Sequence, residues 1–218
     1  MRTRLGIDEA GRGCVLGPMV FGGFLIAEEH EAGLRALGAR DSKKVSAKKR
    51  VAMRGKLEDA AKAWRVVEIQ PAILDAESLG EITKRVIVDL AEELRPDVLV
   101  LDAPVPPSQI PRYRIDLLRR LADRGLRGIE IIAENGADDT YACCSAASIL
   151  AKTTRDASLA AIQEQAGVPF GSGYPSDPKT RAYLKEVWIE HGEWPAWVRT
   201  KWDTIRRVVA ECEQPRLL

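Results

Sequence analysis

The sequence predicts an α/β fold in which a mixed β-sheet carries helices on its faces and a helical appendage closes the chain. Two observations lead to this prediction. Two strand-like runs come first, joined by glycine-containing turns, and strand-like and helix-like segments then alternate as far as about residue 164. With 218 residues, 45% of them hydrophobic, the chain can bury a sizeable core as one domain, or as one domain with an appendage.

The first 70 residues predict a hairpin, two helical segments and a third strand. Ser46 is a suitable N-cap for the second helical segment, and Pro71 ends the third strand. In chain order we expect strands at 1–7 and 19–27, a short helix or turn at 28–37, a helix from 46 to about 63 and a strand at 64–70.

The remaining residues predict two more strands among longer helices. Ser78 and Glu81 have the spacing of a capping box, which starts a helix that runs to about Leu94. The continuous apolar run at 98–101 is typical of a strand covered on both faces. The later segments are a helix at 112–124, a strand at 128–133, a helix rich in small residues at 141–164 and two closing helices at 178–191 and 200–212.

Acidic residues follow three of these strands, at Asp8 with Glu9, at Asp102, and at Asp138 with Asp139. If the strands are neighbours, the carboxylates meet at one edge of the sheet. A few carboxylates, water and a substrate phosphate are enough to hold Mg²⁺. Two such ions about 4 Å apart can activate water and stabilise a leaving 3′-oxygen. The alternative is that each acid is a helix N-cap or a solvated loop end.

Asp8 and Glu9 cannot both be ligands as regular strand residues, because adjacent strand residues point to opposite faces. One of them must lie beyond the strand, or act through its carbonyl or a bound water. The turn Gly11-Arg12-Gly13 follows directly. Glycines let the backbone approach a ligand closely, and a guanidinium suits a phosphate, so the stretch suggests phosphodiester chemistry. An ordinary glycine turn is the alternative.

Composition limits the classes of partner and compartment. The net charge is only +1, so a polyanion would need a local basic face. The four cysteines have no metal-finger spacing, which favours free thiols in a reducing compartment. No signal peptide and no long apolar run occurs, so we expect a cytoplasmic protein without a membrane partner.

Four motifs resemble those of ribonuclease HII. They are Gly-Ile-Asp-Glu-Ala-Gly-Arg-Gly at 6–13, Asp-Ser-Lys-Lys at 41–44, Ala-Asp at 137–138 before Ser-Ala-Ala-Ser-Ile-Leu-Ala-Lys at 145–152, and Gly-Ser-Gly-Tyr-Pro-Ser-Asp-Pro at 171–178. The Trp-, Arg- and Lys-rich stretch around 194–202 looks most like the archaeal-type members. The matches spread from residue 6 to about residue 204.

This resemblance implies a ribonuclease H-like fold with a mixed five-stranded sheet. We divide the chain into a catalytic domain at 1–170 and a substrate-recognition loop with helices at 171–218. The implied activity is endonucleolytic cutting of RNA in RNA/DNA hybrids and of single ribonucleotides embedded in duplex DNA. It leaves 3′-hydroxyl and 5′-phosphate ends and depends on Mg²⁺ or Mn²⁺, with two ions expected. A monomer is expected.

Carried over residue by residue, the resemblance gives an acidic tetrad and a substrate-binding set. Asp8, Glu9, Asp102 and Asp138 would be the catalytic and metal-binding residues. Asp8 would bridge the ions, Asp102 and Asp138 would hold one side each, and Glu9 would position water or the second ion. The turn Gly11, Arg12 and Gly13 would meet the ribose 2′-hydroxyl and adjacent phosphate, and Tyr174 would pack on the sugar. In this context we expect Lys43 and Lys152 to approach the scissile phosphate or to orient a carboxylate.

Several questions stay open from the residues alone. Gly136 stands where the family often has Lys, and Asp139 competes with Asp138 as the ligand. A Holliday-junction-type or transposase-like nuclease can share the fold and acids without reading a 2′-hydroxyl, and a binding module with a degenerate site is the non-enzymatic alternative. Arg199, Lys201, Arg206 and Arg207 line a duplex groove or merely solvate the last helix, whereas the four late tryptophans favour core positions.

Overall fold

The computed structural model describes residues 1–39 and 46–213. The chain divides into two compact units. Unit 1 comprises Met1–Ala10, Val20–Val67 and Gly80–Thr154, and unit 2 comprises Gly11–Met19, Glu68–Leu79 and Arg155–Leu218. The motif at 41–44, and with it the candidate Lys43, lies outside the described residues. The predicted division of the chain at residue 170 stays a prediction.

Unit 1 is built on a mixed five-stranded sheet, as predicted, and its strand order is β3-β2-β1-β4-β5. β1 pairs antiparallel with β2 and parallel with β4, and β4 pairs parallel with β5. Strand β1 continues three residues beyond its expected end, because its pairing with β2 extends to Ala10 opposite Val20. The strands are β1 (Thr3–Ala10), β2 (Met19–Ala27), β3 (Ala63–Ile69), β4 (Val98–Asp102) and β5 (Glu130–Glu134).

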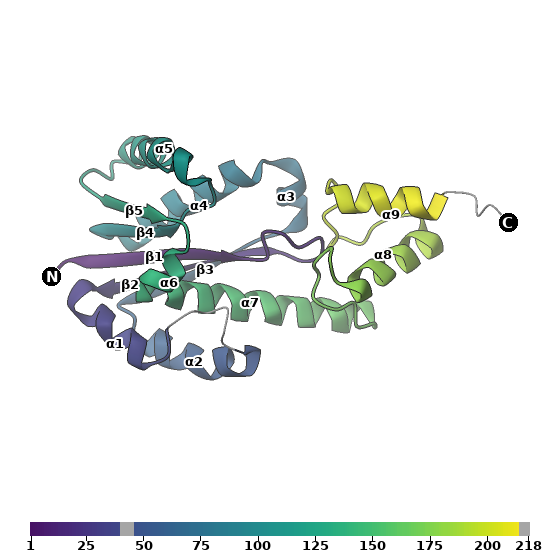
Figure 1. The fold of residues 1–218 in the computed structure, drawn as a ribbon, viewed down its shortest axis with the longest axis horizontal. Helices are drawn as coiled ribbons and strands as arrows, with labels where there is room; N and C mark the ends of the chain where they lie inside the picture. The colour runs from purple at the N-terminus through teal and green to yellow at the C-terminus, as the bar shows by residue number, and fades with distance from the viewer. Residues whose placement is uncertain (40–45, 214–218) are drawn as a thin grey trace. The chain divides into compact units, whose positions relative to one another are not determined.

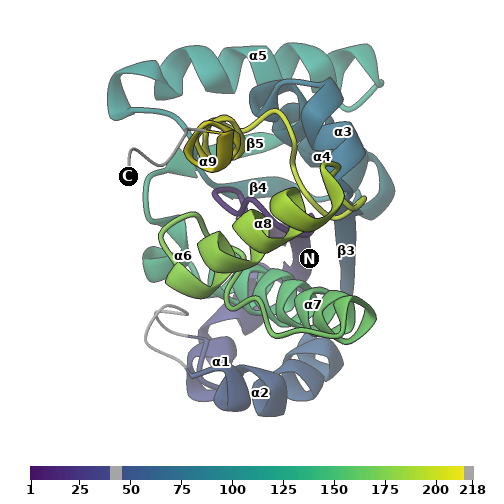
Figure 2. The ribbon, with the colours of Figure 1, turned by 90° about the vertical axis from the view of Figure 1, so that its right-hand side faces the viewer.

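Helices cover both faces of this sheet. The helices α1 (Glu31–Ala36), α2 (Ala47–Ala60) and the first part of α7 (Ala142–Ala166) lie on one face, and α4 (Leu79–Leu94) with α5 (Ile110–Asp123) lies on the other (Figures 1 and 2). On the α7 face, Val98 and Val100 of β4 pack in one buried cluster with Leu34, Leu57 and the small side chains of α7.

Helix α7 lies against the backbone of the sheet because glycines face it. A Cβ at Gly6 would lie 2.3 Å from the backbone carbon of Cys143, and a Cβ at Gly22 would lie 2.2 Å from the carbonyl oxygen of Ala147. Real Cβ atoms do not approach backbone atoms so closely, so these positions accept only glycine. The start of α7 is anchored by Glu31, whose carboxylate accepts the Cys143 N–H at 3.1 Å.

Unit 2 is mainly helical. It contains α3 (Pro71–Ala76), the last part of α7, α8 (Pro178–His191) and α9 (Asp203–Glu213). Asp177 caps α8 by accepting the Lys179 N–H at 2.9 Å, and Gly192 ends the helix with a φ of 67°. Trp194, Trp197 and Trp202 pack against the buried cluster of this unit, and Trp188 stacks on Trp194. These contacts agree with the prediction that the four late tryptophans are packing residues.

The differences from the predicted elements concern short helices and boundaries. Pro71 does more than end β3, because it is also the first residue of α3. The predicted acidic loop contains α6 (Ala137–Thr140), and 3₁₀ turns occur as η1 (Glu28–His30) and η2 (Pro107–Gln109). Helix α2 ends at Ala60 because β3 already begins at Ala63. Among residues 1–39 and 46–213, no helix is both long and apolar enough to cross a membrane.

Candidate active site

Asp8 and Asp102 occupy equivalent positions on neighbouring parallel strands. The register pairs Ile7 with Leu101, so the next residues on the two strands are Asp8 and Asp102. Both side chains point to the α7 face, because residues two positions earlier, Gly6 and Val100, contact α7 or its buried cluster. Asp8 is only 7% exposed. The sheet therefore brings two of the predicted ligands together at one edge.

Asp138 approaches these carboxylates from α6, which corrects the expectation that it stands at a strand end. The left-handed Gly136, with a φ of 77°, precedes this helical turn. Its N–H donates to the Asp102 carboxylate at 2.7 Å and so ties the start of α6 to the end of β4. Asp138 is 2% exposed, whereas Asp139 is exposed to solvent. Burial next to Asp102 supports Asp138 over Asp139 as the candidate ligand.

The electrostatics of the three acids show that they influence one another. Burial is the largest cause that raises the pKa of Asp8 to about 6, and the charges of Asp138 and Asp102 add to the increase. A hydrogen bond with Ser148 opposes it. Burial also raises the pKa of the Cys144 thiol, and the same three carboxylates raise it further. In unit 1, Asp8, Asp102 and Asp138 are thus near enough for their charges to act on one another.

Glu9 lies on the other face of the sheet. It is part of β1, where it pairs with Phe21, so neither Asp8 nor Glu9 lies beyond the strand. The alternative that one of these two residues lies beyond the strand is therefore wrong. As a strand residue next to Asp8, Glu9 can serve the Asp8 face only through its carbonyl or a bound water.

The donor chemistry of this edge fits a hard divalent cation. Mg²⁺ and Mn²⁺ prefer carboxylate oxygens and keep several waters. Burial, and to a smaller extent the charges of Asp138 and Asp102, raise the pKa of Asp8, so a cation held at this edge would favour the ionised carboxylate. Within the described residues, no three acidic, histidine or cysteine side chains are arranged as a ready-made metal cluster. Such an edge suits an ion that draws its remaining ligands from water and substrate.

Ser148 is a functional candidate that the residue-by-residue prediction missed. It is fully buried on α7 and its side chain hydrogen-bonds Asp8. Ser145 and Lys152 lie three residues before and four residues after it, so all three share one face of α7. Lys152 is partly exposed there. The spacing of the Ser-Ala-Ala-Ser motif contained the signal, because serines three apart on a helix face the same neighbour.

A cavity of about 370 Å³ opens beside Asp138. It lies at the junction of α1 and α6, where the Arg35 guanidinium donates to the Thr140 carbonyl oxygen at 2.7 Å. Tyr141 also borders the cavity, and its hydroxyl donates to Glu134 at 3.2 Å. Asp138 is therefore buried against protein but adjoins a space large enough for water or a ligand group.

In unit 2 the structure brings the Gly11-Arg12-Gly13 turn and Tyr174 together. The Cys14 N–H donates to the Gly11 carbonyl at 3.2 Å and closes the turn, while Gly11 has a φ of 80°. A Cβ at Gly13 would lie 3.6 Å from Cε1 of Tyr174. These two parts of the predicted substrate-binding set, far apart in sequence, are thus neighbours.

Arg155 supports this pairing and was not predicted from the sequence. Its guanidinium carbon lies 5.4 Å from the Tyr174 ring centroid, and its Nη1 donates to the Ser172 carbonyl at 3.3 Å. Its Cγ would be 3.3 Å from a Cβ at Gly11. An arginine placed between a glycine turn and an aromatic ring fixes both, and only its position just after the Ser-Ala-Ala-Ser motif hinted at a role.

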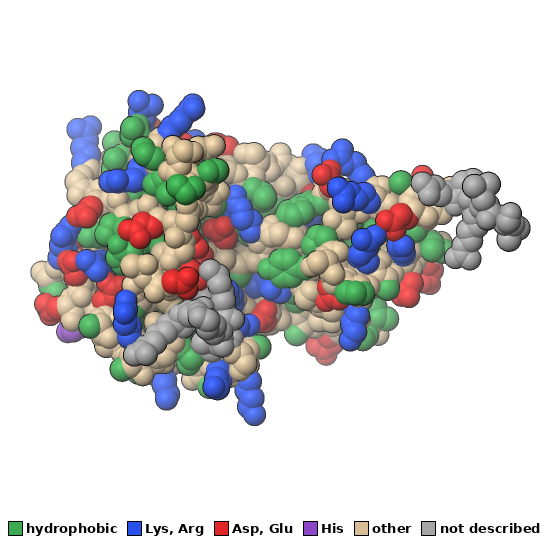
Figure 3. Space-filling model, in the orientation of Figure 1, with side chains coloured by type: hydrophobic (Ala, Val, Ile, Leu, Met, Phe, Trp, Pro, Cys, Tyr) green, Lys and Arg blue, Asp and Glu red, His purple; other side chains and the backbone are tan. Residues whose placement is uncertain are grey.

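Both expectations for Arg199, that it lines a duplex groove or that it solvates the last helix, are wrong. It is 0% exposed, so it neither lines a groove nor solvates a helix. The other members of that basic set, Lys201, Arg206 and Arg207, are exposed. Basic residues also gather in α2, where Lys and Arg side chains project at the edge of the molecule (Figure 3). Among them, Arg54 is committed to structure by its hydrogen bonds to Glu58 and Thr154, both at 2.7 Å.

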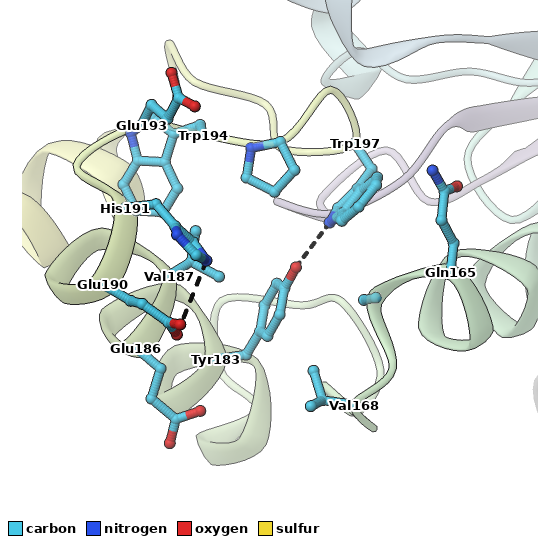
Figure 4. A pocket seen from close by; sticks show the side chains of 12 residues that line it. Gln165, Val168, Tyr183, Glu186, Val187, Glu190, His191, Glu193, Trp194 and Trp197 are labelled. Atoms are coloured by element: carbon cyan, nitrogen blue, oxygen red, sulfur yellow. Dashed lines mark hydrogen bonds and ion pairs between the residues drawn. The ribbon is translucent and has the colours of Figure 1, made fainter.

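A second cavity, of about 500 Å³, lies in unit 2 between α8 and the end of α7. Figure 4 shows Trp197 donating its ring N–H to the Tyr183 hydroxyl at one wall, at 3.0 Å, and His191 beside Glu190 at another. None of the candidate catalytic or substrate-binding residues lines it. Its walls belong to the tryptophan-rich core of the appendage, and we assign it no part in the chemistry.

Comparisons with known proteins identify the family of the chain. The family model of Ribonuclease HII matches residues 5–205. Ribonuclease HII of Methanosarcina acetivorans is 39% identical over 217 residues, which cover 96% of each chain. Ribonuclease HII of Thermococcus kodakarensis is 36% identical over 216 residues, which cover 97% of this chain and 91% of that protein.

Solved structures give the same answer. The ribonuclease H2 of Pyrococcus horikoshii superposes with a TM-score of 0.87 at 33% identity and covers 98% of this chain and 100% of its own. RNase HII of Archaeoglobus fulgidus, solved in a complex with PCNA, superposes with a TM-score of 0.83 at 36% identity over 98% of both chains. The chain therefore belongs to the ribonuclease HII family and is an endoribonuclease.

Proposed function

We propose that this endoribonuclease cuts the RNA strand of RNA/DNA hybrids and single ribonucleotides embedded in duplex DNA, leaving 3′-hydroxyl and 5′-phosphate ends. The observation that carries the proposal is the convergence of Asp8, Asp102 and Asp138 on one edge of the sheet, where their charges act on one another. Membership of the ribonuclease HII family supports the choice of substrate.

Asp8, Asp102 and Asp138 would hold Mg²⁺ or Mn²⁺, with Asp8 shared between two ions. Ions held there would supply activation of water and stabilisation of the leaving oxygen. Ser148 keeps the Asp8 carboxylate oriented through its hydrogen bond, and burial excludes bulk water from that carboxylate. Glu9 contributes through its carbonyl or a water, because its side chain lies on the other face of β1.

Recognition of the ribose is assigned to the turn formed by Gly11, Arg12 and Gly13 together with Tyr174. Only Glu9 and Ala10 separate Asp8 from this turn in the sequence. Bare backbone N–H groups can meet a 2′-hydroxyl and a phosphate oxygen, and the Tyr174 ring offers a flat face to the sugar. Lys152, on the Ser148 face of α7, and Lys43 would approach the scissile phosphate.

The remaining parts of the proposal concern partners and place of action. Residues 171–218 would contribute substrate recognition, with the exposed Lys201, Arg206 and Arg207 as contacts to the duplex backbone. We propose a monomer that acts in the cytoplasm. The Archaeoglobus relative was solved in a complex with PCNA.

The test uses a DNA duplex that carries one ribonucleotide, incubated with Mg²⁺ or Mn²⁺, with the cut site and the product ends mapped. We expect cleavage beside the ribonucleotide by the natural chain and none by the Asp8→Asn variant, because the variant loses a carboxylate that would hold the ions. Circular dichroism and thermal unfolding check that the variant is folded.

Two results would decide against the proposal. Turnover by a folded Asp8→Asn variant would remove Asp8 from the reaction. Equal cutting of an all-DNA duplex would favour the transposase-like or junction-cutting alternative, since such enzymes need no 2′-hydroxyl. A long RNA/DNA hybrid in the same assay shows which of the two ribonuclease substrates is preferred.

A further inference from the structure

Arg199 is the largest of the fully buried side chains, although it carries a charge. Its Nε donates to the Gly17 carbonyl at 3.0 Å and its Nη1 donates to the Arg12 carbonyl at 3.2 Å. The guanidinium carbon lies 5.2 Å from the ring centroid of Trp202. Burying a guanidinium is costly unless its donors are used, so a charge in this position requires a reason.

The partners of Arg199 lie at the two sides of one loop. Arg12 is the middle residue of the Gly11-Arg12-Gly13 turn, and Gly17 ends the loop that follows it. The backbone makes the same connection, since the Arg199 N–H donates to the Val15 carbonyl at 3.0 Å and the Gly17 N–H donates to the Trp197 carbonyl at 2.8 Å. The guanidinium therefore acts as a brace inside this loop.

The contact with Arg12 fixes the direction of a particular N–H group. In a trans peptide, the carbonyl of Arg12 and the N–H of Gly13 lie in one plane and point in opposite directions. Because Arg199 holds the carbonyl, the Gly13 N–H points away from the buried guanidinium. Within the described residues, this N–H donates to no protein acceptor. It is left for a ligand oxygen.

The segment that carries Arg199 is itself anchored. Asp75 of α3 accepts hydrogen bonds from the Thr200 N–H at 2.7 Å and the Thr200 hydroxyl at 2.8 Å. Desolvation lowers the pKa of Arg199 to about 10, so the guanidinium keeps its charge at neutral pH. Arg199 is thus held in place by the contacts of Thr200 with Asp75, and its guanidinium remains a charged donor at neutral pH.

We propose that Arg199 is a positioning residue for ribose recognition, which orients the Arg12–Gly13 peptide so that the Gly13 N–H faces the substrate. The inference rests on the proposed function for the role of the turn, and goes beyond it by placing the determinant of selectivity on a buried side chain that does not touch the substrate. A lysine cannot replace it, because one ammonium group lacks the planar fork that reaches two carbonyls at once.

The experiment compares Arg199→Lys and Arg199→Gln, each combined with Asp8→Asn so that bound duplex is not cut. The measured quantity is the ratio of Kd for an all-DNA duplex to Kd for the same duplex with one ribonucleotide. We expect this ratio to fall several-fold, up to about 10-fold, in both variants, the loss typical of one neutral hydrogen bond, with affinity for all-DNA unchanged. Thr200→Val is the matched control, since it loosens the same segment but leaves both carbonyl contacts, and it should keep the ratio.

Two further measurements keep the outcome decisive. Guanidinium at millimolar concentration should restore the ratio in Arg199→Ala, whereas methylammonium should not. Hydrogen exchange of residues 11–17 should speed up in Arg199→Lys and Arg199→Gln, with the sheet unchanged.

An unchanged exchange rate in the loop, or an equal loss of selectivity in Thr200→Val, overturns the positioning role. If the natural chain shows no preference for the ribonucleotide duplex, the proposed substrate fails instead. Hydrogen exchange alone then decides whether Arg199 orients the turn.

Discussion

The ionised carboxylate of Asp8 destabilises the folded protein at neutral pH. Its carboxyl has a pKa of about 6 in the folded protein, against an ordinary value of 3.8, chiefly because it is buried. The folded state therefore holds the proton more tightly than the unfolded chain does. Well below pH 3.8 the group is protonated in both states and has no effect on stability. As the pH rises through 6, the destabilisation develops fully.

Replacing Asp8 with Asn should therefore stabilise the metal-free protein at pH 7 and do so much less at pH 4. A shift of about two pKa units corresponds to about 3 kcal/mol, and this is the order of the gain expected above pH 6. Urea unfolding at both pH values in the presence of a chelator measures it. Equal stability of the two proteins at pH 7 would show that the ionised Asp8 carboxylate does not destabilise the fold.

At the residue scale, the positions of Asp8 and Asp102 could be predicted from the sequence, whereas the residues that support the site could not. Asp8 and Asp102 could be placed because a strand end fixes where the next side chain lies. Arg155 and Arg199 could not, because an arginine in a polar stretch of sequence looks solvated until the fold surrounds it. Ser148 lay within a recognised motif, yet its bond to Asp8 depends on how closely α7 approaches the sheet.

Among the elements, α7 decides whether the site forms. It packs on the sheet through positions without a side chain, and Gly22, which pairs with Asp8 across β1 and β2, is the tightest of them. Any outward shift of α7 moves Ser148 away from Asp8. Packing and catalysis are therefore linked at this helix.

We expect Gly22→Ala to destabilise the fold by about 1–3 kcal/mol, the usual cost of overpacking, because its Cβ would meet the Ala147 carbonyl oxygen at 2.2 Å. Gly55→Ala in α2 is the matched control, since a Cβ there meets nothing within 4 Å and alanine favours helix by about 1 kcal/mol. Urea unfolding of both variants gives the comparison. A neutral Gly22→Ala variant would mean that α7 can move without loss.

The elements that the sequence did not predict are the short ones. Strand β2 and the long helices α4, α5 and α7 contain enough residues for their periodicity or capping signals to be read. Helices α3 and α6 have six and four residues, too few for a periodic pattern. Asp138 was placed at a strand end for that reason, although it stands on α6.

At the scale of the whole molecule, divalent ions should act as a second source of stability. A ligand that binds only the folded state raises the midpoint of unfolding. We expect millimolar Mg²⁺ or Mn²⁺ to raise the Tm of the natural chain at pH 7 and to do so less at pH 5, where Asp8 is largely protonated. Differential scanning calorimetry with and without the ion measures this.

Asp8→Asn is the control for that experiment, because it removes the carboxylate that we propose holds the ions and should abolish most of the ion-dependent shift. An identical shift in the variant would place the stabilising ion elsewhere on the molecule. Repeating the scan with Asp139→Asn tests the assignment of Asp138, since loss of an exposed neighbour should leave the shift intact.

The hydrogen bond between Arg12 and Arg199 spans 187 positions of the chain. Contacts between such distant positions form late in folding, since the intervening chain must first be brought together. During synthesis the loop at residues 11–17 leaves the ribosome early, whereas its partner Arg199 is made almost at the end. A ribosome that stalls before residue 199 would release a chain whose Gly11-Arg12-Gly13 turn lacks its contact with Arg199.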